Sequence, residues 1–166
     1  EVTMARIRPS IRLVLFLVFV VLPFGAAVAV DGKPSRKQPV RFSDAQSQAE
    51  EFIGYTRSIQ LTAQQRETWE AALGAMASPC CKDFRLSTCC CPCNLAKSAW
   101  GLANFLIARR GANAAEVQNS VNGWLAFVNP SGFSGDVCVS SGGCGRKFAE
   151  NGCGGMDERD FHAARQ

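Results

Sequence analysis

The pattern of apolar and polar positions predicts four amphipathic helices in the middle of the chain. Between Ser43 and Arg57, apolar side chains recur every three or four residues, which places them on one face of a helix that Ser43 can cap. A second helix is expected from Thr62, because Thr62 and Gln65 have the spacing of a capping box. It should end just before Pro79, since the residue before a proline avoids helical dihedral angles.

The third and fourth helices are expected after a short cysteine-bearing loop. Pro92 suits the first position of a helix and Gly111 suits the position just past its end, so the third helix should lie between them. Asn113 and Glu116 have the spacing of another capping pair, and the apolar stripe that follows them runs as far as residues 129–130.

The C-terminal part of the chain has a different character. Residues 131–166 are rich in Gly and Ser and carry Cys138, Cys144 and Cys153. Fixing such chain costs roughly 1–2 kcal/mol of backbone entropy per residue, so we expect its cysteines to anchor it to the helices. No strand pattern is evident, including in the loop of residues 80–91. The predicted fold class is all-α, a small bundle of about four helices with a Gly/Cys-rich C-terminal loop region pinned by disulfides or metal.

The N-terminal part of the chain has the features of a secretory signal peptide. Arginines precede an apolar run from Leu13 to Leu22, and an A-x-A pattern of small residues ends at Ala29. Cleavage near Ala29 predicts an extracytoplasmic bacterial protein, periplasmic or secreted; a retained membrane anchor is the alternative. The expected organisation is a signal peptide (1–29), a flexible leader (30–42), a helical domain with the cysteine cluster (43–130) and a Gly/Cys-rich irregular tail (131–166).

Charge and composition exclude several classes of function. The net charge of +4 over 166 residues is too balanced to predict a nucleic-acid partner. No second apolar run of spanning length follows the signal, so no membrane contact is expected after cleavage. No phosphate-binding loop and no Ser/His/Asp set is evident, which argues against a nucleotide cofactor and a serine hydrolase.

Cysteine is the residue type that carries the candidate chemistry. The chain has nine cysteines, and small exported domains of this kind are usually held together by disulfides. Because nine is odd, at least one thiol must be free, bridge two chains or bind metal. Six of the nine lie between Cys80 and Cys93, which makes that cluster the candidate site.

The first interpretation of the cluster is a site for a soft metal ion. A loop that returns to a helix start can bring four sulfur atoms together, and thiolates select Cu(I) or Zn(II). His162 is the only histidine, so an all-sulfur site is expected. The predicted metal ligands are Cys80, Cys81, Cys90 and Cys93, with Cys89 and Cys91 as alternates or disulfide partners.

The second interpretation is thiol–disulfide exchange by Cys90 and Cys93, which form a C-x-x-C pair. The free N–H groups and partial positive charge at a helix N-terminus favour a thiolate and lower its pKa. The Cys90 thiolate would attack a disulfide of a thiol-bearing partner protein, which releases one partner sulfur, and Cys93 would then resolve the mixed disulfide. Asn94 stands where covalent haem attachment needs histidine, so no haem is expected. A third interpretation is a disulfide-stapled interaction module without chemistry of its own.

Residues 79–128 resemble two families of exported proteins. Pro79-Cys80-Cys81, the C-x-x-C pair and the helix–Gly–helix sequence after it resemble exported bacterial proteins named for a PCYCGC motif. The helix pair that follows C-x-x-C is also similar to the thiol-reductase subunit of cytochrome c maturation, a small three-helix domain. This second resemblance implies that Cys90 and Cys93 are a reactive pair. From the residues themselves, the leading hypothesis is an exported helical protein that binds a soft metal ion for sequestration or delivery.

Overall fold

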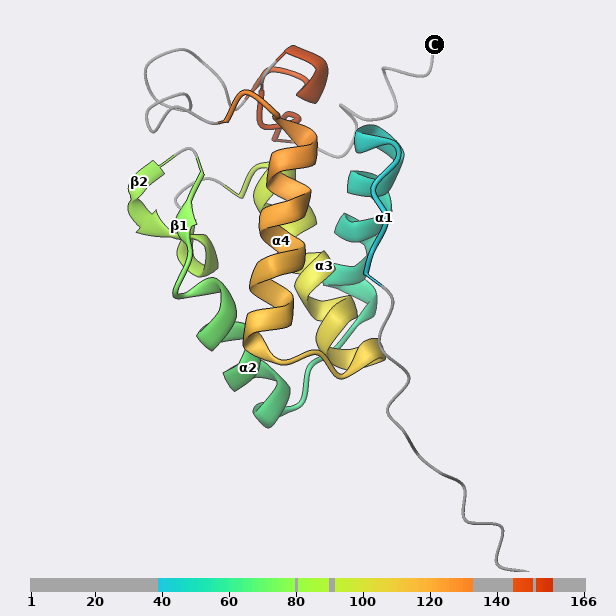
Figure 1. The fold of residues 1–166 in the computed structure, drawn as a ribbon, viewed down its shortest axis with the longest axis vertical. Helices are drawn as coiled ribbons and strands as arrows, with labels where there is room; N and C mark the ends of the chain where they lie inside the picture. The colour runs from blue at the N-terminus through green and yellow to red at the C-terminus, as the bar shows by residue number, and fades with distance from the viewer. Residues whose placement is uncertain (1–38, 80, 90–91, 133–144, 151, 157–166) are drawn as a thin grey trace, which may run out of the picture. The chain divides into compact units, whose positions relative to one another are not determined.

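The computed structural model describes residues 39–79, 81–89, 92–132, 145–150 and 152–156, and within these ranges the side chains of Cys81 and Lys82 are not placed. The predicted signal peptide lies outside the described residues. Helices dominate the part that is described, which confirms the all-α prediction (Figure 1). The four α-helices there are α1 (Ala45–Ser58), α2 (Ala63–Leu73), α3 (Asn94–Arg110) and α4 (Ala114–Val128).

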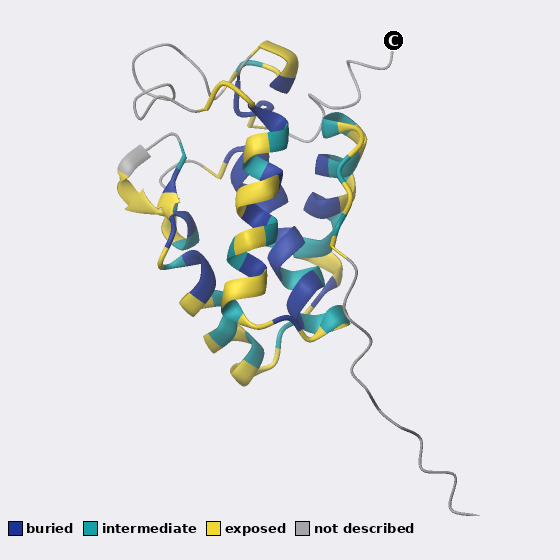
Figure 2. Cartoon of the chain, viewed as in Figure 1, coloured by how far each residue is buried: buried dark blue, intermediate teal, exposed yellow. Residues whose placement is uncertain are grey.

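Helix α3 is the centre of the bundle. It contacts α1 along much of its length and also packs against α2 and α4. Ten of its seventeen residues are buried, whereas α4 alternates buried and exposed positions in the manner of a surface helix (Figure 2). A helix buried on several faces needs small residues where its neighbours come closest. The four alanines and the one glycine of α3 provide them.

The helix ends follow mainly from local sequence signals. Both predicted capping boxes form, Thr62 with Gln65 at the start of α2 and Asn113 with Glu116 at the start of α4. Gly111 ends α3 in the left-handed conformation, with φ of 58°. Helix α1 is capped one residue later than predicted, because the carboxylate of Asp44 accepts the hydrogen bond from the backbone N–H of Ser47, at 2.7 Å.

The segment between α2 and α3 differs from the prediction. Helix α2 ends at Leu73, and the chain then forms a small antiparallel hairpin, β1 (Ala77–Ser78) with β2 (Cys81–Arg85), followed by a 3-10 turn η1 (Leu86–Thr88). The prediction of an irregular loop in this segment was wrong. Strands of two and five residues are too short for the sequence to show an alternation of apolar and polar positions. The N–H of Leu86 donates to the Met76 carbonyl at 3.0 Å and closes the base of the hairpin, and the fully buried Leu86 side chain packs the hairpin against the bundle.

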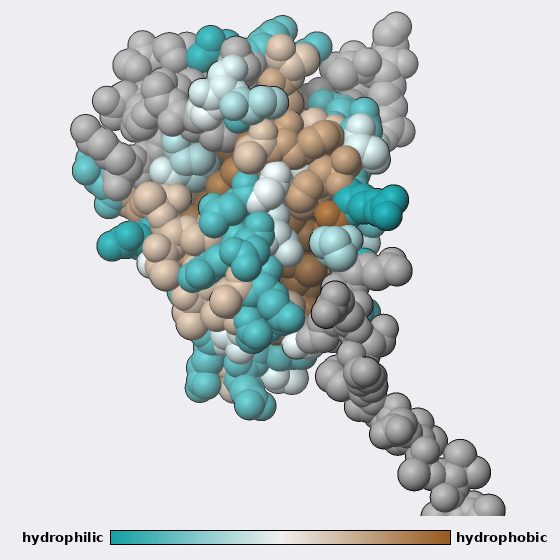
Figure 3. All heavy atoms as spheres, viewed as in Figure 1, coloured by the Kyte–Doolittle hydropathy of each residue, from teal (hydrophilic) through white to brown (hydrophobic). Residues whose placement is uncertain are grey.

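An aromatic cluster joins the start of the described chain to α1 and α4. The ring of Phe42 lies 5.4 Å from that of Trp124 and 5.8 Å from that of Phe127, measured between centroids. Trp124 is fully buried, and its indole N–H donates to the hydroxyl of Ser98 on α3 at 2.9 Å. Figure 3 shows apolar residues gathered along the line between α4 and α1. Thus Phe42, in the last position of the segment expected to be a leader, packs onto the helices. None of the described helices is both long and apolar enough to cross a membrane.

The close approach of α1 to α3 predicts that Gly101→Ala destabilises the protein strongly. A methyl group at this position would stand 1.7 Å from the backbone carbonyl oxygen of Phe52, and backbone cannot move aside without separating the two helices. We expect the substitution to lower the free energy of unfolding by roughly 2–4 kcal/mol, as overpacking at a rigid contact does. Urea unfolding followed by circular dichroism measures this change.

Gly54→Ala in α1 is the matched control for that measurement. No atom lies within 4 Å of the methyl group it would add, so only helix propensity changes. An increase of about 0.5–1 kcal/mol in the free energy of unfolding is expected. Equal effects of the two substitutions would contradict the packing described for Gly101.

The raised pKa of Tyr55 predicts a loss of stability at alkaline pH. Burial, and then the hydrogen bond from its hydroxyl to Glu51, raise its pKa from 10.0 to about 12. The folded protein therefore keeps the phenol proton at a pH where the unfolded chain releases it. The stability that this adds is complete below pH 10 and is lost as the pH rises towards 12. Tyr55 is the only tyrosine, so tyrosinate absorbance reports its titration directly. A weaker fall of stability with pH is expected for Tyr55→Phe, and identical pH profiles would contradict the assignment.

Candidate thiol site at the start of helix α3

The predicted ligands are distributed over two loops that the structure describes only in part. Cys80 and Cys90, together with the alternate Cys91, lie outside the described residues. Cys81 begins strand β2, although its side chain is not placed. Cys93 is the N-cap of α3, which begins at Asn94 and so starts two residues later than the helix predicted from Pro92.

Ser78 adjoins two of the clustered cysteines, Cys81 and Cys89. Its backbone pairs with that of Cys81 across the hairpin, and its hydroxyl oxygen lies 3.1 Å from the Sγ atom of Cys89. Ser78 is buried, whereas Cys89 is half-buried at the edge of the core. The hairpin therefore returns the chain so that the start of strand β2, at Cys81, lies near Cys89. Sequence reasoning missed Ser78, because only the hairpin shows that it adjoins both cysteines.

The start of α3 is covered by the C-terminal segment of residues 152–156. The N–H of Asn94 donates to the carbonyl of Gly155 and the N–H of Leu95 to the carbonyl of Cys153, both at 2.9 Å. The side-chain amide of Asn94 donates to the carbonyl of Gly154 at 2.7 Å. Figure 1 shows the C-terminal segment in red close to the start of α3. These bonds occupy two of the helix N–H groups that were expected to stabilise a thiolate at this end of the helix.

Two cysteines are enclosed where this segment meets the helix. Cys93 and Cys153 both have no exposed surface and both belong to the main hydrophobic core. The aromatic ring of Phe148 packs on Gly154, which has φ of +76°, and this contact closes the segment over the helix start. The glycines on both sides of Cys153 are the sequence signal for this arrangement. They allow a backbone that bends sharply and approaches another backbone closely.

The described residues do not by themselves make a metal site. Among them, no group of three or more His, Cys, Asp or Glu side chains is placed to hold a metal ion. Within the predicted cluster, only Cys89 and Cys93 have placed side chains. The structure associates Cys89 with Ser78 and the hairpin, and Cys93 with the C-terminal segment.

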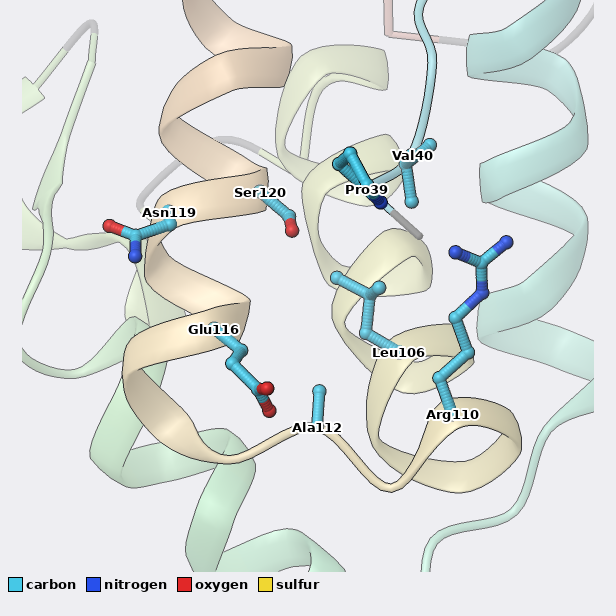
Figure 4. A pocket seen from close by; sticks show the side chains of 8 residues that line it. All are labelled: Pro39, Val40, Leu106, Arg110, Ala112, Glu116, Asn119 and Ser120. Atoms are coloured by element: carbon cyan, nitrogen blue, oxygen red, sulfur yellow. The ribbon is translucent and has the colours of Figure 1, made fainter. Parts of the chain in front are cut away.

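A pocket between α3, α4 and the extended residues before α1 contains no cysteine (Figure 4). Its volume is about 200 Å³. The guanidinium of Arg110 lies over the ring of Phe105, 5.0 Å from its centroid, and a carboxylate oxygen of Glu116 accepts the backbone N–H of Asn113 at 2.8 Å. The pocket is lined by Pro39, Val40, Leu106, Arg110, Ala112, Glu116, Asn119 and Ser120. Both charged groups at the pocket therefore serve the fold.

Gly154→Ala is expected to detach the C-terminal segment from α3. A methyl group would meet the ring of Phe148 at 2.4 Å, and an L-residue with positive φ adds strain of about 1–2 kcal/mol. The amide hydrogens of Asn94 and Leu95 should then exchange faster with solvent, which hydrogen-exchange mass spectrometry measures. Gly145→Ala is the control, because nothing lies within 4 Å of the added methyl group. Unchanged exchange at both amides in Gly154→Ala would contradict the seating of the segment.

Comparison with known proteins identifies no relative. No family model matches the chain, and no curated protein or solved structure matches it significantly. The resemblance of residues 79–128 to two exported families stays a prediction. The function proposed for this chain consequently rests on the placement of its cysteines.

Proposed function

We propose that this chain is an exported, cysteine-rich helical protein that binds a soft metal ion, Cu(I) or Zn(II), between the β1–β2 hairpin and the start of α3. The observation that carries the proposal is the position of Ser78. It pairs with Cys81 through its backbone and lies 3.1 Å from the sulfur of Cys89 through its side chain. The segments that carry Cys81 and Cys89 thus adjoin one residue, and a multi-thiolate site needs ligand-bearing segments that lie close together.

The surroundings of Cys89 and Cys93 refine the proposed ligand set. Thiolates bind Zn(II) tetrahedrally at about 2.3 Å, so the ligands must come from chain segments that approach each other closely. Ser78 pairs with Cys81 through its backbone and contacts the sulfur of Cys89, so the segments that carry these two cysteines approach each other. We propose Cys80 and Cys90, their neighbours in the sequence, as the other two ligands. Cys89, an alternate in the sequence-based set, thereby becomes a principal ligand. Cys93, expected as a ligand, lies instead at the contact between α3 and the C-terminal segment.

The hydroxyl of Ser78 has a defined part in such a site. In the metal-bound form it donates a hydrogen bond to the Cys89 thiolate, because a thiolate can only accept. Hydrogen bonds of this kind fix the direction of a ligand, and their removal typically weakens metal binding by about 10–100-fold. Ser78 is buried, so water does not readily replace its hydroxyl.

Thiol–disulfide exchange by Cys90 and Cys93 is the second candidate function. The observation that favours it is the complete burial of Cys93, which suits a resolving thiol that must react only with its own partner cysteine. This reading requires Cys93 to alternate between a thiol and a bond to Cys90. It predicts a protein without metal that contains one readily reducible Cys90–Cys93 disulfide.

Metal titration of the mature protein tests the proposed site. Under mild reduction and without chelator, native mass spectrometry should show one bound Zn(II) or Cu(I). Ser78→Ala keeps every thiol, and we expect it to weaken binding at least about 10-fold because the Cys89 thiolate loses its donor. Cys89→Ser should weaken binding further, since it removes a ligand.

Ser58→Ala is the matched control, because Ser58 is an exposed α1 residue whose hydroxyl donates to the carbonyl of Gly54 in its own helix. The metal affinity of this variant should equal that of the unchanged protein. Circular dichroism confirms that each variant is folded. A protein that binds neither metal, or variants at Ser78 and Cys89 that bind as tightly as the control, would overturn the proposal.

A further inference from the structure

A second pocket lies between the end of α1, the linker to α2, and helices α2 and α3. Its volume is about 210 Å³, and no cysteine lines it. Trp69 from α2 and Trp100 from α3 form part of its wall, and Ile59 and Leu61 of the linker add aliphatic surface. A small cavity that combines aromatic and aliphatic walls with a few polar groups has the composition of a ligand-binding site.

The polar groups at this pocket have hydrogen-bonding capacity that the fold does not use. Within the described part of the chain, the side chains of Gln60, Arg66 and Asn104 have no hydrogen-bond or ion-pair partner. The indole N–H of Trp69 is buried and also lacks a partner there. Burying a donor without an acceptor is costly, so buried donors are normally satisfied. An acceptor brought into the pocket would therefore stabilise the Trp69 side chain.

Charge and size together select the class of ligand. Among the described residues that line the pocket, Arg66 is the only charged one, so a negative group is favoured there. The planar guanidinium offers paired donors, which match the two oxygens of a carboxylate. The indole N–H of Trp100 donates to the Leu86 carbonyl at 2.7 Å, so the Trp100 ring is held in place as a wall. The small volume restricts the ligand body to a short chain or a single ring.

We propose that this pocket binds a small organic carboxylate. The carboxylate pairs with the guanidinium of Arg66, and the apolar body of the ligand packs against Trp69 and Trp100. One carboxylate oxygen also accepts the indole N–H of Trp69. This side chain is only half-buried, and small side-chain adjustments of the kind that bring the two atoms together are common on binding. The site is separate from the metal site proposed at the cysteines, and neither depends on the other.

Benzoate is the probe for this site, because it joins a carboxylate to one aromatic ring. Two-dimensional NMR of isotope-labelled protein shows one indole N–H signal for each of the three tryptophans, and Trp69→Phe identifies the Trp69 signal by its loss. Benzoate should shift the Trp69 signal downfield, since this N–H gains an acceptor. The Trp124 signal is the internal control, because that indole is fully buried and already donates to Ser98. A titration that leaves the Trp69 signal unchanged would overturn the inference.

Arg66→Gln tests the anchor of the carboxylate. Arg66 is exposed, so the substitution leaves the core intact, and benzoate affinity should fall about 10–100-fold because a charge-assisted hydrogen bond is lost. Arg109→Gln is the matched control, since it removes the same charge from an exposed position of α3 outside the pocket. Benzoate affinity in this control should equal that of the unaltered protein. Equal affinities in the two variants would contradict the role of Arg66.

Two further probes separate the contribution of the charge from that of the ring. Acetate keeps the carboxylate without the ring, and benzyl alcohol keeps the ring without the charge. Each should bind at least about 10-fold more weakly than benzoate, because each loses one of the two contacts. Binding of either as tight as that of benzoate would overturn the proposed ligand class.

A chelator distinguishes this pocket from the proposed metal site. Benzoate affinity should be the same with and without chelator, and the same in Cys89→Ser. A loss of benzoate binding under either condition would place the carboxylate on a metal ion and overturn the inference. Metal affinity is measured without benzoate, so a protein that binds benzoate through Arg66 and binds no metal would refute the metal site alone.

Discussion

The close contact between α1 and α3 is the constraint on which the rest of the structure depends. Gly101 has no side chain, and the carbonyl of Phe52 occupies the place where a Cβ atom would lie. This contact sets α3 deep in the bundle, where it can also receive α2 and α4. The hydrogen bond from Trp124 to Ser98 then fixes α4 against the same helix, and Trp100 reaches from α3 to the Leu86 carbonyl to hold the hairpin side. Every element near the cysteines is therefore positioned through α3.

The N-terminus of α3 joins the helical bundle to the cysteine cluster, whose last member, Cys93, is the N-cap of this helix. A helix start presents N–H groups that need acceptors, and here the C-terminal segment supplies two backbone carbonyls and accepts the amide of Asn94 with a third. The segment has glycine where the backbone must turn and approach closely, and Phe148 covers it. Its order follows from the helix end that it caps, since its own sequence has little capacity to form regular structure.

The surroundings of Cys89 and Cys93 differ in a way that their spacing in the sequence does not show. Cys89 is half-buried and has a hydroxyl beside its sulfur, which suits a ligand that an ion can reach. Cys93 is fully buried where α3 meets the C-terminal segment, in the same hydrophobic core as Cys153. Access to solvent therefore distinguishes two cysteines that lie four positions apart in the sequence.

Local signals in the sequence were sufficient for the number of helices and most of their ends. The capping boxes at Thr62 and Asn113 and the helix end at Gly111 involve residues within one turn of each other. They can therefore be predicted from the sequence alone. The end of α2, the hairpin and the start of α3 at Asn94 depend on partners distant in the chain, such as Leu86 with Trp100 and Leu95 with Cys153. The candidate site divides in the same way. Its cysteine density is visible in the sequence, whereas the contact of Cys89 with Ser78 and the burial of Cys93 where α3 meets the C-terminal segment were decided by tertiary structure. Contacts across the fold bring together residues whose sequence separation carries no information about their distance.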